Sequence, residues 1–155
     1  MRALSAAVAM AAVFSSAGYA QSCDTAPEFA GHRTANGVVR AQYNAVSRAE
    51  WADVIHFGEE ILASNGAPGH KVAALTNLCA AYAATGEYTM AIEACDQALE
   101  MRDGAWRALN NRGAALWLSG QHDAAMASFQ AAEASSSGED EVTANLSLTQ
   151  CVAAG

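Results

Sequence analysis

The sequence predicts an all-α protein built from repeated helical hairpins, and three observations support this prediction. Apolar residues recur at helical spacing through most of the chain, with little of the alternation that is typical of strands. Alanine is abundant and only one proline follows residue 27, which also favours helix. The third observation is that one segment of the chain is repeated 34 residues later.

The repeated segment comprises residues 85–98, which resemble residues 119–132. A less regular copy begins near Arg48 and lies 37 residues before the first of these two. The loop-like composition of residues 65–69 accommodates the three extra residues. Three pairs of small residues keep the 34-residue separation: Gly86 with Gly120, Ala91 with Ala125, and Ala98 with Ala132.

A helix-turn-helix unit of 34 residues is the period of the tetratricopeptide repeat family, and the chain resembles that family over about residues 36–152. The first copy departs most, with Gln42 where the family usually has Gly or Ala and Gly58 where it has a large residue. The resemblance implies a right-handed α-solenoid of about three helical hairpins with a C-terminal capping helix. The matching positions are Leu78, Tyr82, Gly86, Tyr88, Ala91 and Ala98, and then Gly113, Gly120, Ala125, Phe129 and Ala132.

The helical domain is expected to occupy residues 36–152, after an N-terminal arm. Residues 21–35 show no clear period and are expected to form this arm as an irregular segment. The acidic residues 139–141 favour the start of a last helix, which covers the end of the stack. The expected hairpins pair residues 36–48 with 50–63, 70–84 with 87–100, and 104–118 with 121–134.

Residues 1–20 have the layout of a secretory signal peptide. A positively charged start is followed by the uncharged apolar run 3–14 and by small residues that end at Ala20. That run of about a dozen residues is too short to span a bilayer, which needs roughly twenty. We therefore expect cleavage after Ala20 and a mature chain in the periplasm or outside the cell.

The charge of the chain is acidic, with a formal net charge of −8. Removal of residues 1–20 takes away one arginine, which leaves seven basic against 16 acidic residues. Phosphate binding needs a cationic surface, so nucleic acid is not an expected partner. No segment after the signal peptide is long and apolar enough to suggest a membrane span.

The cysteines Cys23, Cys79, Cys95 and Cys151 all belong to the expected mature chain. In an oxidising compartment disulfides are the usual state. Cys79 and Cys95 lie on the two helices of one hairpin, so we expect a bond between them; the alternative is a pair of buried thiols. The pairing of Cys23 and Cys151 stays open. No Cys-x-x-Cys pair or nearby histidine indicates a metal site.

The sequence shows no pattern that predicts catalysis. The four histidines are isolated, and no Ser or Cys stands in a nucleophile motif. No glycine-rich phosphate loop appears. We therefore expect no catalytic residue and no cofactor.

A row of asparagines is the main candidate for binding. Asn77, Asn111 and Asn145 are each 34 residues apart in the first helix of successive hairpins, and Arg40 holds that place in the first copy. First helices form the concave inner wall of such a solenoid, and the resemblance implies that an Asn there hydrogen-bonds the backbone of an extended peptide. An amide suits this task because it both donates and accepts. The alternative is that these amides bond a neighbouring helix or face water.

The charge pattern suggests what kind of segment binds. Basic residues fall mainly in first helices and acidic residues in second helices, so an acidic segment or a C-terminal carboxylate would suit the inner wall. We hypothesise an exported scaffold that docks a peptide segment of a partner protein in its concave groove. A self-associating envelope protein is an alternative, and a thiol-active enzyme is a third. The candidate partner-binding residues are Arg40, Tyr43, Asn77, Arg107, Asn110, Asn111 and Asn145.

Overall fold

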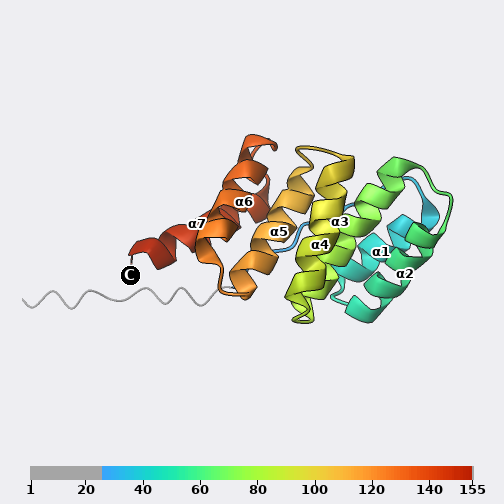
Figure 1. Cartoon of the computed structure of the whole chain (residues 1–155), viewed down its shortest axis with the longest axis horizontal. Helices are drawn as coiled ribbons and strands as arrows, with labels where there is room; N and C mark the ends of the chain where they lie inside the picture. The colour runs from blue at the N-terminus through green and yellow to red at the C-terminus, as the bar shows by residue number, and fades with distance from the viewer. Residues whose placement is uncertain (1–25, 155) are drawn as a thin grey trace, which may run out of the picture.

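The computed structural model describes residues 26–154, and in this part of the chain the prediction of an all-α fold is confirmed. Successive helices follow one another along the long axis, from α1 and α2 at one end to α7 at the other (Figure 1). The predicted signal peptide and Cys23 lie outside the described residues. The helices are α1 (Gly37–Ser47), α2 (Trp51–Ala63), α3 (Pro68–Ala84), α4 (Tyr88–Met101), α5 (Trp106–Leu118), α6 (His122–Ala134) and α7 (Asp140–Ala154).

The helix boundaries lie within two residues of the expected ones. The start of α3 differs because Pro68 occupies its first turn, where the missing backbone N–H of proline costs no hydrogen bond. The last helix begins at Asp140, and both Asp140 and Glu141 lie in its first turn. Acidic side chains are favourable there because the N-terminus of a helix carries partial positive charge.

Each hairpin turns through the same backbone conformation. Gly86 and Gly120 have φ values of 87° and 82°, in the left-handed region that glycine adopts without strain. Ala49 stands in the equivalent place of the first hairpin with φ 55°. In all three turns the next residue donates its N–H to the carbonyl five residues back, which ends the first helix: Glu50 to Ala45, Glu87 to Tyr82, and Gln121 to Leu116.

The helices form two layers. The first helices α1, α3, α5 and α7 contact one another in order, whereas α2, α4 and α6 contact only helices that adjoin them in the chain. Since the first helices are the more closely spaced layer, their free face is the concave side of the stack. We call this face the inner wall.

The two unusual residues of the first copy, Gln42 and Gly58, compensate each other in size. In the third hairpin a Cβ added to Gly113 would lie 2.5 Å from the Phe129 ring, so glycine makes room for the large residue. In the first hairpin the sizes are reversed: a Cβ on Gly58 would lie 2.7 Å from Nε2 of Gln42. The total volume between the two helices is thus kept, as close packing requires.

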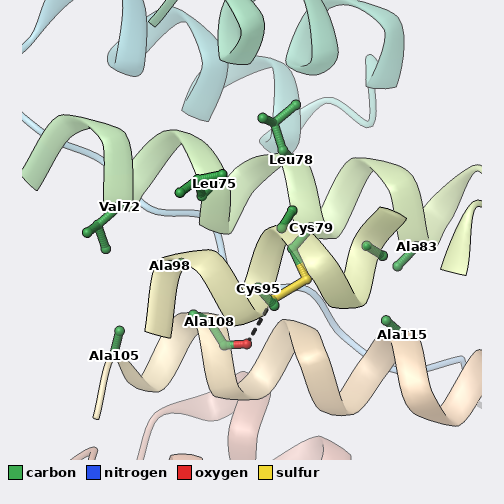
Figure 2. Packing of buried hydrophobic residues seen from close by; sticks show 12 residues of the cluster. Val72, Leu75, Leu78, Cys79, Ala83, Cys95, Ala98, Ala105, Ala108 and Ala115 are labelled. Atoms are coloured by element: carbon green, nitrogen blue, oxygen red, sulfur yellow. Dashed lines mark hydrogen bonds between the residues drawn. A yellow bond between two sulfur atoms is a disulfide. The ribbon is translucent and has the colours of Figure 1, made fainter. Parts of the chain in front are cut away.

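The middle hairpin fills the same place with a disulfide. Cys79 on α3 and Cys95 on α4 are bonded, with their Cα atoms 5.4 Å apart, as predicted from the hairpin (Figure 2). Both are fully buried among small side chains such as Ala98 and Ala108. Cys151 is also disulfide-bonded.

Candidate peptide-binding wall

The asparagine row of the inner wall holds a segment of the same chain. This segment comprises residues 26–36, which are the described part of the expected N-terminal arm and the residue that follows it. It precedes α1 and contains no helix or strand, and from here on we call it the arm. Each asparagine amide clamps one arm residue by accepting from its N–H and donating to its C=O. The residues clamped are His32 by Asn77 (2.7 and 2.9 Å), Ala30 by Asn111 (2.8 and 3.0 Å), and Glu28 by Asn145 (2.8 Å for both).

The arm lies in an extended conformation. In an extended chain the N–H and C=O of alternate residues point to the same edge, and here residues 28, 30 and 32 are the bonded ones. Two residues of extended chain span roughly 6.6–6.8 Å, so one clamp falls on each successive first helix. The arm runs antiparallel to the order of the hairpins, from α7 across α5 to α3.

The asparagines of the row also make hydrogen bonds to other groups besides the arm. Two further amides, Gln42 of α1 and Asn110 of α5, join this network. Asn77 donates to Oε1 of Gln42 at 3.1 Å, and Asn111 donates to the carbonyl of Thr76 at 3.0 Å. Asn110, predicted as a binding residue, donates to the carbonyl of Glu28 and accepts from Asn145. These side chains are at most 1% exposed. The prediction that these amides bond a partner peptide therefore needs correction, because the arm of the same chain occupies them.

Three successive arm residues, Phe29, Ala30 and Gly31, pack closely against the helices. Ala30 is fully buried. Gly31 lies against Tyr43, so that a Cβ at this position would be 3.0 Å from the Tyr43 ring. Phe29 packs edge-on against Trp51 with ring centroids 6.0 Å apart. These contacts were not predictable from the sequence, because a segment that bonds to side-chain amides needs no helical or strand period.

The other predicted wall residues are not part of the row. Arg40 is exposed on α1, and Gln42 rather than Arg40 continues the amide network there. Tyr43 and Arg107 are half-buried and lie beside the arm, with the Arg107 guanidinium 4.1 Å from the centroid of the Trp106 ring. The structure thus separates the predicted residues into four buried amides beneath the arm, two side chains next to it, and Arg40, which is exposed.

A cleft of about 500 Å³ lies beside the arm. Its lining carries both charges, with arginines from the arm and α5 and glutamates from the start of α7. The lining residues are Phe29, Gly31, His32, Arg33, Tyr43, Val46, Ser47, Trp106, Arg107, Glu139 and Glu141. A smaller cavity of about 120 Å³ is lined in part by His32, Arg102 and Arg107.

His32 has a strongly perturbed ring. Burial, followed by the positive charges of Arg107 and Arg102, lowers the pKa of His32 to about 4. The Nδ1 atom is buried and has no hydrogen-bond partner among the described residues. The ring is therefore neutral at pH 7, and the field around it is positive although the whole chain is acidic.

The described part of the chain contains neither a candidate metal site nor a candidate membrane span. Residues 26–154 contain no group of three or more His, Cys, Asp or Glu side chains arranged to hold a metal ion. Within the same residues, no helix has the length and hydropathy needed to cross a membrane.

Comparison with known proteins gives the family of the central part of the chain. No curated protein matches it. Residues 72–103 and 107–136, which cover α3 to α6, match the model of the tetratricopeptide repeat family. Together with the stacked hairpins, this match shows that residues 72–136 form two tetratricopeptide repeats within an all-helical solenoid.

Proposed function

We propose that this protein is an exported scaffold that binds an extended segment of a partner protein in the cleft beside the arm. Tetratricopeptide repeats generally act as protein-interaction scaffolds without catalysis. The observation that carries the proposal is the cleft itself, which runs beside the arm and is lined by Tyr43, Trp106 and Arg107.

The residues predicted to bind a partner have two roles in this proposal. Tyr43 and Arg107 contact the partner directly, because they are half-buried in the cleft lining. The asparagines act indirectly, since their amides are already used in holding the arm. Aromatic and arginine side chains are the types that most often dominate binding energy.

Export is supported by the sequence of residues 1–20 and by the disulfides. The Cys79–Cys95 bond and the bonded state of Cys151 fit an oxidising compartment. The buried position of Cys79 and Cys95 gives no support to a thiol-active enzyme, because a reactive thiol must be accessible.

The proposal is tested by photo-cross-linking in intact cells. A photoreactive amino acid replaces Tyr43 in the cleft, and in a matched variant it replaces Glu93, which is exposed on α4. We expect a discrete cross-linked partner from position 43 and none from position 93. Arg107→Ala in the position-43 variant should reduce that product, whereas Arg48→Ala, at the end of α1, should not.

The reverse pattern, with a partner captured from position 93 and none from position 43, would place binding on the outer helices and contradict the proposal. A product with twice the mass of the chain would instead favour self-association.

A further inference from the structure

The arm has a second edge that is unpaired. Residues 28, 30 and 32 direct their backbone groups to the asparagine row, so the N–H and C=O of the intervening residues point to the opposite edge. Within residues 26–154, the backbone groups of Phe29, Gly31 and Arg33 have no hydrogen-bond partner.

This edge borders the cleft. Phe29, Gly31 and Arg33 all belong to the cleft lining. An unpaired edge of extended chain is a template for another extended chain, because each backbone donor and acceptor needs a partner. The asparagine row fixes the arm in the extended form beforehand, so a second chain does not have to order it.

We propose that the free edge of the arm is a docking surface, and that its occupant is an extended segment of another protein, paired to the arm by backbone hydrogen bonds. This inference rests on the proposed function and names its mode of binding. The segment lies along the arm, in the cleft that Tyr43, Trp106 and Arg107 also line. Main-chain bonds supply affinity, and the neighbouring side chains supply selectivity.

The charges of the cleft define the segment further. Arg33 and Arg107 line the cleft together with His32, whose pKa is lowered first by burial and then by the positive charges of Arg107 and Arg102. An acidic side chain of the segment therefore fits next to the two arginines, and a basic side chain of the segment pairs with Glu139 and Glu141, which line the same cleft. Gly31 packs against the Tyr43 ring, so this ring stands next to the middle of the docked segment.

The test uses an eight-residue peptide selected from a random library for binding to the purified protein. Amide hydrogen exchange of residues 28–33 is then followed by NMR with and without this peptide. In the free protein the amides of Glu28, Ala30 and His32 should be protected and those of Phe29, Gly31 and Arg33 should exchange fast. Addition of the peptide should protect the second group and leave the first unchanged.

Two variants separate the backbone from the side chain at the accessible end of the edge. Arg33→Pro removes both the N–H and the charge, whereas Arg33→Ala removes only the charge. One lost hydrogen bond should make the proline variant bind about two- to tenfold more weakly than the alanine variant. Methylation of alternate peptide nitrogens should abolish binding in one of the two possible registers and spare the other.

The outcomes distinguish this inference from the proposed function. If the peptide perturbs Tyr43 but leaves the amides of Phe29, Gly31 and Arg33 exchanging fast, the edge pairing is wrong and binding in the cleft stands. A library that yields no peptide, or only peptides that bind the outer helices, contradicts both. Protection of these amides in the free protein that rises with its concentration would identify the occupant as a second copy and overturn the assignment to another protein.

Discussion

At the scale of single residues, the arm depends on side chains that make several contacts at once. Each asparagine of the row donates and accepts with one arm residue, and Asn77 and Asn111 also bond an adjoining helix. An amide is the side chain that offers both functions without charge. The 34-residue spacing of Asn77, Asn111 and Asn145 identified these residues in the sequence, but the identity of their partner was not encoded in that spacing.

His32 makes the stability of the protein dependent on pH. Its folded-state pKa of about 4 lies below the ordinary histidine value of 6.5, so the unfolded chain binds more protons between these values. The contribution of His32 is fully present above pH 6.5 and is lost as the pH falls toward 4. In urea denaturation, the free energy of unfolding of the parent protein should therefore fall more steeply across this window than that of the His32→Gln variant.

His56→Gln is the matched control, because His56 is exposed on α2. This variant should keep the pH dependence of the parent protein. Identical profiles for the parent and His32→Gln would show that the ring is not held neutral by its surroundings.

At the scale of elements, the arm behaves as an additional strap across α3, α5 and α7. Its position was not predictable from residues 21–35, which carry neither a helical period nor strand alternation. The hairpins were predictable, because each turn and each helix is determined by neighbours close in the sequence. The pairing of Cys79 with Cys95 belongs to this second group, since both residues lie in one hairpin.

Asn111→Ala tests the strap. The substitution leaves the N–H and C=O of Ala30 and the carbonyl of Thr76 without their partner in a buried site. The free energy of unfolding should fall by about 2–4 kcal/mol, measured by urea denaturation. Asn44→Ala, at an exposed position of α1, should change it by less than about 0.5 kcal/mol. Equal effects of the two variants would show that the row does not hold the arm.

The disulfide between α3 and α4 is tested by the double variant Cys79→Ala, Cys95→Ala. Loss of a bond across 16 residues should lower the free energy of unfolding by about 3 kcal/mol. The measurement is made without reductant, because Cys151 is also disulfide-bonded. Peptide mapping of the parent protein should recover Cys79 joined to Cys95, and free alkylation of both thiols in the unfolded, unreduced protein would contradict the bond.

At the scale of the whole molecule, the chain combines an expected export signal with a solenoid whose two ends are linked by the arm. The arm contacts α7 through Glu28 and leads directly into α1. Contacts of this kind join the first and last hairpins, which a solenoid of sequential neighbours would leave independent. The arm thus favours unfolding of the stack as one unit.

Export is the prediction that concerns the whole chain. N-terminal sequencing of the protein recovered from cells should find Gln21 as the first residue, and fractionation should find the protein outside the cytoplasm. Recovery of a cytosolic protein that still carries residues 1–20 would overturn the predicted compartment.

The sequence by itself determined the helices, their hairpin turns, the 34-residue period and the bond between Cys79 and Cys95. All of these depend on residues within one hairpin or on a pattern that repeats along the chain. Only the tertiary structure decided what covers the inner wall. The arm bonds Asn77, Asn111 and Asn145 at separations of 45, 81 and 117 residues. Its bonds use the N–H and C=O groups that every non-proline residue carries, so the pairing leaves no periodic pattern in the sequence.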